Sequence, residues 1–328
     1  MGKEYKEILD FACITDAHQR IKSYIHETPI LSNSTLNELV HATIFFKCEN
    51  FQKVGAFKIR GATNAVLSLD EIESSRGVVT HSSGNHAAAL AYAAGLRGIP
   101  AYIVMPENAP AVKVNAVRNY RGIITFCRPT LESRESTAEM IVNDTGASFI
   151  HPYNDYKVIA GQATAALELL KKLPDIDIVL APVGGGGLLS GTALTVKYLN
   201  PRIKVYGCEP ASADDAYRSL AANTIVPSHN PITIADGLKT SLGDKTFPII
   251  KHNVEGILLV TEQEIIDAMR FVSERMKIII EPSSAVVVAA LLFKKLEWSG
   301  LRVGAIISGG NVDFEALFSD LKRKFNIS

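Results

Sequence analysis

The chain has 328 residues, of which 47% are hydrophobic and 21% charged, as expected for a globular protein of two lobes or one large α/β unit. Lys plus Arg and Asp plus Glu both total 34, so the formal net charge is zero, and neither nucleic acid nor an anionic membrane is an expected partner. The most apolar stretch, residues 285–293, is too short to span a bilayer.

The four cysteines are scattered and form no C-x-x-C pair: Cys13, Cys48, Cys127 and Cys208. This usage is typical of free thiols in a reducing compartment. The first residues are charged rather than apolar, unlike a secretory signal. The cytoplasm is the expected location.

Short apolar strands alternate with amphipathic or Ala-rich segments, which is typical of α/β proteins with mostly parallel sheets covered by helices. In chain order, strands are predicted over residues 43–48, 77–80, 101–105, 123–127, 148–151, 178–183, 205–208, 257–260 and 303–307. Helices are predicted over residues 62–69, 86–95, 111–120 and 132–143, and from residue 188. We expect a small lobe, residues 75–153, inserted in a larger lobe of residues 1–74 and 154–328.

Four consecutive glycines, Gly184, Gly185, Gly186 and Gly187, lie between a predicted strand and a predicted helix. Without Cβ atoms, successive N–H groups turn toward one anion, and the helix N-terminus adds a favourable potential. The loop therefore predicts a phosphate site. A dinucleotide is one alternative, with Glu209 at the end of the next strand as ribose ligand, although G-x-G-x-x-G is not satisfied.

Two other polar loops follow predicted strands, residues 82–86 (SSGNH) and 308–311 (SGGN). The first opens an Ala-rich helix, and its hydroxyl and N–H groups suit a carboxylate. An ordinary helix cap is the alternative for this loop. Ligands of parallel sheets bind where the strands end, so the three loops are expected to share one site.

Lys58 lies between Phe57 and Ile59, ahead of the predicted helix over residues 62–69. Desolvation and a nearby helix N-terminus lower the pKa of a lysine amine and favour the neutral form that a Schiff base requires. A solvated surface lysine is the alternative that spacing alone leaves open.

Residues 51–62, FQKVGAFKIRGA, resemble the Schiff-base segment of the serine racemase and serine/threonine dehydratase family, pyridoxal-phosphate enzymes with a tryptophan-synthase-β-like fold. Further motifs of that family are matched in order at residues 29–31, 81–86, 160–162, 184–187, 234–237, 281–282 and 308–313. The resemblance covers nearly the whole chain.

The resemblance implies that Lys58 forms a Schiff base with pyridoxal 5′-phosphate. Further cofactor ligands are expected at Asn85, Gly184–Gly187 and Ser308, and the substrate carboxylate is expected on Ser82, Ser83, Asn85 and His86. Lys58 and Ser83 would act on opposite faces of Cα, as racemisation requires. Because the Ser308 hydroxyl is a weak proton donor to the pyridine nitrogen, elimination of a β-hydroxyl should accompany racemisation.

The resemblance also implies a divalent-cation site made by Glu209, the Ala213 carbonyl and Asp215, in an oxygen environment suited to Mg²⁺, Mn²⁺ or Ca²⁺. A solvated acidic loop is the alternative. Positions that match an activating ATP site are Asn33, Ser34, Thr35, Lys53, Tyr120, Lys277 and Asn311. Val54 and Ala88 replace the family's usual Thr and Gln there, so two side-chain donors are missing.

The expected activity is interconversion of L- and D-serine, with elimination of serine to pyruvate and ammonia, so the enzyme is both an isomerase and a lyase. Dehydration of threonine, serine or 3-hydroxyaspartate without a significant racemase role is the alternative within the family. A nicotinamide-dependent oxidoreductase is the alternative from another class. The expected partners are a small amino acid and a second copy of the chain, since members of the family usually form dimers.

Overall fold

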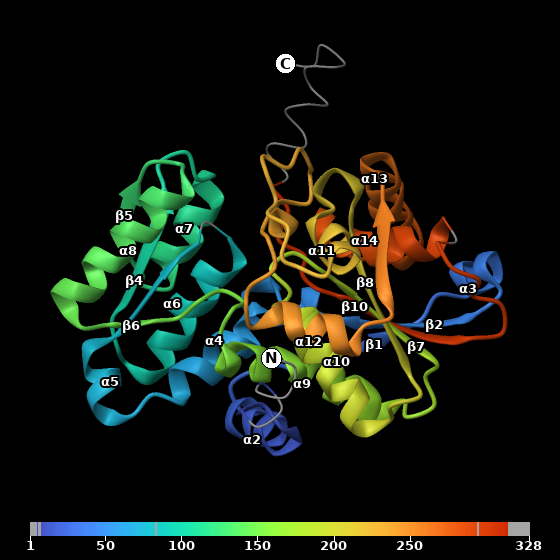
Figure 1. The fold of residues 1–328 in the computed structure, drawn as a ribbon, viewed down its shortest axis with the longest axis horizontal. Helices are drawn as coiled ribbons and strands as arrows, with labels where there is room; N and C mark the ends of the chain where they lie inside the picture. The colour runs from blue at the N-terminus through green and yellow to red at the C-terminus, as the bar shows by residue number, and fades with distance from the viewer. Residues whose placement is uncertain (1–4, 6–7, 83, 294, 314–328) are drawn as a thin grey trace, which may run out of the picture.

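The computed structural model describes residue 5 and residues 8–82, 84–293 and 295–313. Two sheets, each covered by helices, stand side by side, with the smaller sheet on the left in Figure 1. The predicted α/β class with two mostly parallel sheets is therefore confirmed.

The larger sheet has six strands in the order β1-β2-β10-β7-β8-β9. Its strands are β1 (Ile30–Leu31), β2 (Thr43–Cys48), β7 (Ile178–Pro182), β8 (Lys204–Pro210), β9 (Gly256–Val260) and β10 (Arg302–Ile307). All neighbouring pairs are parallel except β1 with β2.

The smaller sheet has four parallel strands in the order β5-β4-β3-β6. Its strands are β3 (Val78–His81), β4 (Ala101–Pro106), β5 (Ile123–Cys127) and β6 (Ser148–Phe149). They all fall between β2 and β7 in the chain, as expected for an inserted lobe. The exact lobe boundaries at residues 75 and 153 stay a prediction.

The helices of the first half are α2 (Phe11–Ile21), α3 (Ser34–Val40), α4 (Lys58–Leu67), α5 (Glu71–Arg76), α6 (Asn85–Arg97), α7 (Ala111–Asn119) and α8 (Leu131–Thr145). Those of the second half are α9 (Tyr156–Lys172), α10 (Gly187–Leu199), α11 (Asp215–Ala222), α12 (Thr246–Asn253), α13 (Glu262–Phe271) and α14 (Pro282–Leu292). No helix in the described part of the chain has the length and apolar character needed to cross a bilayer.

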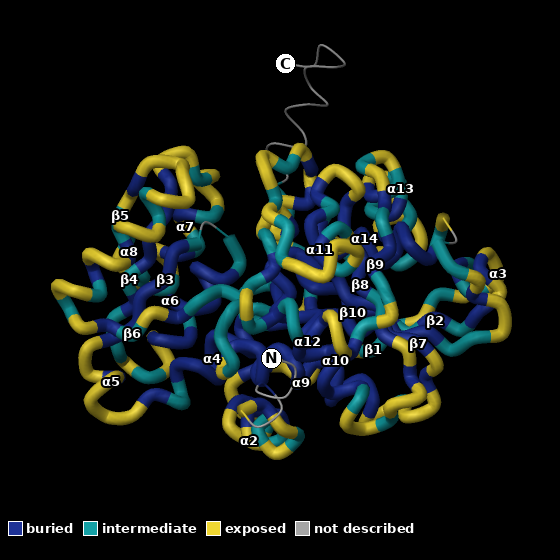
Figure 2. Tube along the Cα trace, viewed as in Figure 1, coloured by how far each residue is buried: buried dark blue, intermediate teal, exposed yellow. Residues whose placement is uncertain are grey.

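Alternation along β7 shows how the six-stranded sheet is buried on both faces. Ile178 and Leu180 pack into the cluster around α14, whereas Val179 and Ala181 pack into the cluster around α10. Successive side chains of a strand point to opposite faces, so a strand covered on both sides is continuously apolar. Figure 2 shows the resulting buried centre of the larger lobe.

The predicted strands are all present, but the helix that carries Lys58 begins earlier than predicted. α4 begins at Lys58 itself rather than at residue 62. Its N-cap residue, Phe57, makes no side-chain capping bond, so the usual sequence signal for a helix start is absent. The short antiparallel strand β1 was not predicted.

Candidate active site

A cavity of about 500 Å³ lies where the loops of the two sheets meet. Its lining includes Phe57, Lys58, Ser82, Asn85, His86, Tyr153, Gly184, Gly185, Gly186, Gly187, Glu281 and Ser308. The three polar loops and the lysine predicted from the sequence therefore share one site. Ser83 lies outside the described residues.

Lys58 is placed by the loop that precedes α4. Ala56 pairs with Gly309 in an isolated β-bridge, and the Phe57 amide donates to the Ser308 carbonyl at 2.9 Å. These backbone contacts hold the segment before Lys58 against the loop after β10. Lys58 and Ser308, 250 positions apart in the sequence, consequently line the same cavity.

The Lys58 amine is half-buried and donates to the Pro152 carbonyl at 2.9 Å. Burial lowers the pKa of Lys58 to about 8, and the negative charge of Glu281 acts in the opposite direction. Near neutral pH the neutral, nucleophilic fraction of this amine is therefore much larger than that of an ordinary lysine. The predicted chemical character of Lys58 fits its surroundings.

The glycine loop, Gly184–Gly187, joins β7 to α10. A Cβ on Gly185 would meet the Tyr153 ring at 2.4 Å, and a Cβ on Gly184 would meet the Leu238 backbone at 2.9 Å. Gly186 has a φ of +88° and offers no side chain to cap α10. The loop is thus restricted to glycine, and the helix N-terminus remains open toward an anion such as a phosphate.

Ser308 ends β10 and is held by a second hydroxyl. Its Oγ lies 2.9 Å from Ser284 Oγ, which also accepts from the Gly309 amide at 2.7 Å. A fixed hydroxyl at the cavity wall is suited to contact a ring nitrogen. The position of Ser308 agrees with the role that the resemblance implies.

The loop after β3 supplies Ser82, Asn85 and His86 to the cavity. Asn85 is the first residue of α6, and the N-cap position is Gly84, which cannot cap the helix with a side chain. Free N–H groups at this end suit a carboxylate. Burial lowers the pKa of His86 well below its usual range, so its imidazole is neutral near pH 7.

Glu281 is a site residue to which the sequence assigned no role. Asn85 Nδ2 donates to the Glu281 carboxylate at 2.9 and 3.1 Å, and Asn85 Oδ1 accepts from Asn311 Nδ2 at 2.8 Å. Burial raises the pKa of Glu281 to about 7. This chain of contacts connects the loops after β3 and β10 across the boundary between the two sheets.

Cationic side chains also line the cavity: Lys113, Arg134 and Lys239. Lys113 pairs with Asp236, which lines the cavity as well. Arg134 lies on α8, in the smaller lobe, where the sequence pattern predicted only a helix. The cavity thus offers positive charge beyond the loop predicted to hold one carboxylate.

Of the expected cation ligands, Glu209 lies near the end of β8 and Asp215 is the first residue of α11, with Ala213 in the short helix between them. Glu209 accepts from the Tyr217 and Ala216 amides at 2.7 and 3.3 Å, whereas both carboxylate oxygens of Asp215 are buried with no hydrogen-bond partner among the described residues. Burial raises the pKa of Glu209 to about 9 and that of Asp215 to about 7. Two buried carboxyl groups, one unpartnered, fit a divalent cation.

The same observations remove the support for a dinucleotide site. Glu209 is only 1% exposed, and its carboxylate faces the backbone amides at the start of α11. It is not among the described residues that line the cavity at the glycine loop. It therefore does not serve as a ribose ligand there.

The candidate nucleotide residues fall in two groups. In the first group, Asn33 caps α3, and Ser34 and Thr35 lie in the first turn of that helix. Asn33 Nδ2 also donates to the carbonyl of Arg275 at 3.4 Å, two residues before Lys277. In the other group, Lys53 lies 5.8 Å from the centre of the Tyr92 ring, which packs edge-on against Tyr120. Asn311 donates to the Val54 carbonyl at 2.8 Å.

A half-buried lysine amine that shares a cavity with a glycine loop at a helix N-terminus defines a pyridoxal-phosphate enzyme, given the two-sheet α/β fold. A family model described as pyridoxal-phosphate dependent enzyme matches residues 21–309. The chain belongs to this family.

Similar proteins cover nearly the whole chain. Serine racemase of Dictyostelium discoideum is 54% identical over 309 residues, which are 93% of this chain and 95% of that protein. Beta-hydroxyaspartate dehydratase of Paracoccus denitrificans is 51% identical over 301 residues, 92% of this chain and 96% of that protein. The structure of maize serine racemase superposes with a TM-score of 0.93 at 46% identity, covering 97% and 98% of the two chains.

Proposed function

We propose that this protein is a pyridoxal-phosphate-dependent serine racemase that also eliminates serine to pyruvate and ammonia. The observation that carries the proposal is the single cavity shared by Lys58, the glycine loop and the Ser82–His86 loop. The identity of 54% with a serine racemase over almost the whole chain supports it.

We assign binding of the cofactor, binding of the substrate and proton transfer to different residues of the chain. The glycine loop binds the phosphate, Ser308 contacts the ring nitrogen, and the N-terminus of α6 binds the substrate carboxylate. When bound, pyridoxal phosphate supplies an electron sink for the electron pair at Cα. The Lys58 amine removes the Cα proton from one face, and Ser83 is proposed to exchange a proton on the opposite face.

Two variants test this division. Lys58→Ala should abolish both racemisation and elimination, because the amine moves the Cα proton in both reactions. Ser83→Ala should impair racemisation and retain elimination of L-serine. Chiral chromatography of the serine pool, together with a pyruvate assay, measures the two reactions. Undiminished racemisation by Ser83→Ala would refute the proposed role of Ser83.

Dehydration of 3-hydroxyaspartate is the second candidate function. The cavity carries Arg134 and Lys239 in addition to the carboxylate-binding loop, and a substrate with a second carboxylate would complement this charge. The relative named beta-hydroxyaspartate dehydratase, at 51% identity, supports this candidate.

We also propose a divalent cation, Mg²⁺ by preference, at Glu209, Ala213 and Asp215, supported by the unpartnered Asp215 carboxylate.

ATP as an activator is a weaker proposal, because Val54 and Ala88 offer no side-chain donors. A cytoplasmic location is supported by the four free thiols. The homodimer is proposed because members of the family usually form dimers, and light scattering tests it.

A further inference from the structure

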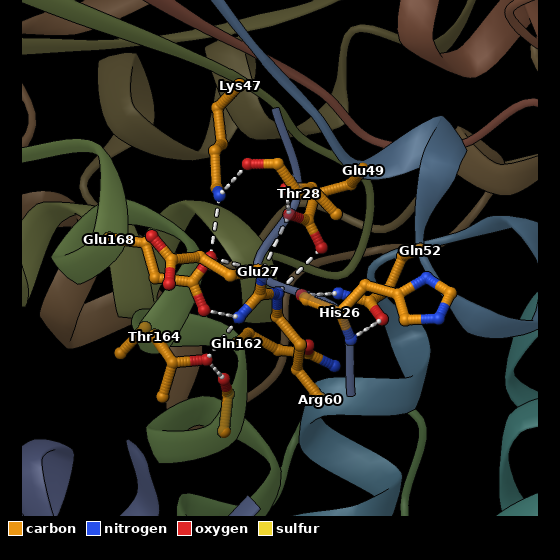
Figure 3. Close-up of polar contacts among 12 residues, drawn as sticks. His26, Glu27, Thr28, Lys47, Glu49, Gln52, Arg60, Gln162, Thr164 and Glu168 are labelled. Carbon is orange, nitrogen blue, oxygen red and sulfur yellow. Dashed lines mark hydrogen bonds and ion pairs between the residues drawn. The ribbon is translucent and has the colours of Figure 1, made fainter. Parts of the chain in front are cut away.

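Four charged side chains are buried together close to Lys58: Lys47, Glu49, Arg60 and Glu168, here called the charge cluster (Figure 3). Arg60 Nε lies 2.6 Å from Glu49 Oε2, and Arg60 Nη1 lies 2.7 Å from Glu168 Oε1. Lys47 Nζ lies 2.6 Å from Glu168 Oε2. The two cations balance the two carboxylates, so the cluster carries no net formal charge.

Stability alone does not account for the charge cluster. Buried ion pairs are often replaced by hydrophobic residues of similar volume with no loss of stability. None of its members is among the described residues that line the cavity, so direct contact with a ligand does not explain it either. The remaining role for the charge cluster is to fix the positions of the elements that carry it.

Arg60 ties three elements together at a position two residues beyond Lys58. It donates to Glu49, which follows β2, and to both Glu168 and Thr164 of α9. A planar guanidinium that is bonded on several sides has one allowed orientation. The first turn of α4, which begins at Lys58, is thereby fixed on α9.

The backbones of α4 and α9 also touch beside the charge cluster. A Cβ on Gly161 would lie 2.5 Å from the Arg60 carbonyl oxygen and 2.6 Å from Gly61 Cα. Gln162 Oε1 accepts from the Gly61 amide at 3.2 Å, and this helix lacks a side-chain cap of its own. Helix α9 therefore supplies both a packing surface and a side-chain acceptor, Gln162 Oε1, for a backbone amide of the turn that carries Lys58.

On the opposite side of α9, α10 also packs with its backbone in close contact. A Cβ on Gly191 would lie 2.6 Å from the Ala163 nitrogen and 2.8 Å from the Ile159 carbonyl oxygen. Helix α10 begins at Gly187, in the glycine loop. Helix α9 thus packs against both the helix that begins with Lys58 and the helix that begins at the phosphate loop (Figure 1).

We propose that α9 is a spacer that sets the position of the Lys58 amine relative to the glycine loop, with Arg60 and Glu168 as the positioning pair on the lysine side. This inference rests on the proposed function in one respect, that both groups bind pyridoxal phosphate. In the linking step the neutral Lys58 nitrogen forms a C=N bond to the aldehyde carbon. The aldehyde oxygen leaves as water with both amine protons.

Two glycine-to-alanine variants separate the two sides of α9. Gly161→Ala pushes α4 away from α9, and Gly191→Ala pushes α10 away. Gly95→Ala is the matched control, because a Cβ there meets nothing within 4 Å. Each is tested with pyridoxal phosphate and with 4′-deoxypyridoxine 5′-phosphate, which lacks the aldehyde. Absorbance follows linkage to Lys58, and calorimetry gives the affinity for the analogue.

Gly161→Ala should slow linkage by about 10- to 100-fold, since small displacements of reacting groups have effects of this size, and should leave the affinity for the analogue unchanged. Gly191→Ala should weaken analogue binding. Gly95→Ala should change neither quantity. Glu168→Gln, which keeps the side-chain shape but removes one of the two buried carboxylates, should repeat the selective loss of linkage. Retained binding of the analogue shows that each of these variants is folded.

Equal losses of linkage rate and analogue affinity in Gly161→Ala and Glu168→Gln would show a merely structural role and overturn the proposal. An unchanged linkage rate in both of these variants would also overturn it. If the parent chain itself failed to link pyridoxal phosphate at Lys58, the proposed function would be wrong, and the inference would go with it. The two failures are therefore distinguishable.

Discussion

The Lys58 amine owes its reactivity to burial, which lowers its pKa to about 8. We expect the rate of linkage to pyridoxal phosphate to rise as the pH approaches about 8 and then to level off, because only the neutral amine attacks. Glu281 raises this pKa, so Glu281→Gln should move the inflection to lower pH. Stopped-flow absorbance measures the profile, and an inflection near the ordinary lysine value of 10.5 would contradict it.

Arg134 allows the two candidate substrates to be distinguished. If its guanidinium binds a second carboxylate, Arg134→Gln should lower kcat/KM for 3-hydroxyaspartate by about 10- to 100-fold, since hydrogen bonds to charged groups contribute about 1.5–3 kcal/mol. Elimination of serine should change little. Arg128→Gln is a control on the same lobe, because Arg128 is exposed and is not among the described residues that line the cavity. Equal losses on both substrates would refute this role.

At the scale of elements, the start of α11 places the Asp215 carboxylate where it has no hydrogen-bond partner among the described residues. Mg²⁺ should therefore raise the midpoint of thermal unfolding, by a stabilisation of about 2.7 kcal/mol at 100 times its Kd. Asp215→Asn should remove this gain. Without Mg²⁺ it should match or exceed the stability of the parent chain, because the buried carboxylate is replaced by a neutral amide.

The adjacent Asp214 provides the control for this experiment. Its carboxylate pairs with Arg218 at 2.7 Å, so Asp214→Asn should keep the stabilisation by Mg²⁺. Differential scanning calorimetry with Mg²⁺ and with a chelator measures both variants. An undiminished response in Asp215→Asn would place the cation elsewhere.

Local patterns predicted the elements well where the signal lies in neighbouring residues. The strand over residues 43–48 and the strand over residues 123–127 have the predicted bounds, because an apolar run between turn residues is a local signal. The start of α4 was missed because no side chain of the N-cap residue Phe57 marks it, and the support for the Gly61 amide comes from Gln162, about 100 positions away. A helix end that is completed by tertiary contacts leaves no mark in the adjacent sequence.

In the candidate site, too, features with a local signal were predicted and features made by distant residues were not. The three loops were predicted because each follows a strand and contains glycine and hydroxyl or amide residues. The charge cluster was not predicted, since Lys47 and Arg60 meet Glu168 across 121 and 108 positions. The contact of Asn85 with Glu281 spans 196 positions. Such pairs depend on how the sheets are arranged, which a single sequence does not specify.

For the molecule as a whole, the site is divided between the two sheets. The glycine loop and Ser308 follow strands of the six-stranded sheet, whereas Asn85 and His86 follow a strand of the four-stranded sheet. The cofactor phosphate and ring nitrogen are therefore assigned to one sheet and the substrate carboxylate to the other. Asn85, an expected cofactor ligand, already connects the two sheets through Glu281 and Asn311, and the substrate carboxylate adds a further contact to the four-stranded sheet.

This division predicts the order in which amide hydrogen exchange slows. Pyridoxal phosphate alone should protect most strongly the peptides that contain the glycine loop and Ser308, because these ligands of its phosphate and ring nitrogen belong to one sheet. Addition of serine should then increase the protection of the peptide that contains Asn85 and His86. Mass spectrometry of exchanged peptides measures both steps, and the peptide of α5, remote from the cavity lining, serves as the internal reference. If serine added no protection to the peptide that contains Asn85 and His86, the assignment of the substrate carboxylate to the loop of the four-stranded sheet would be wrong.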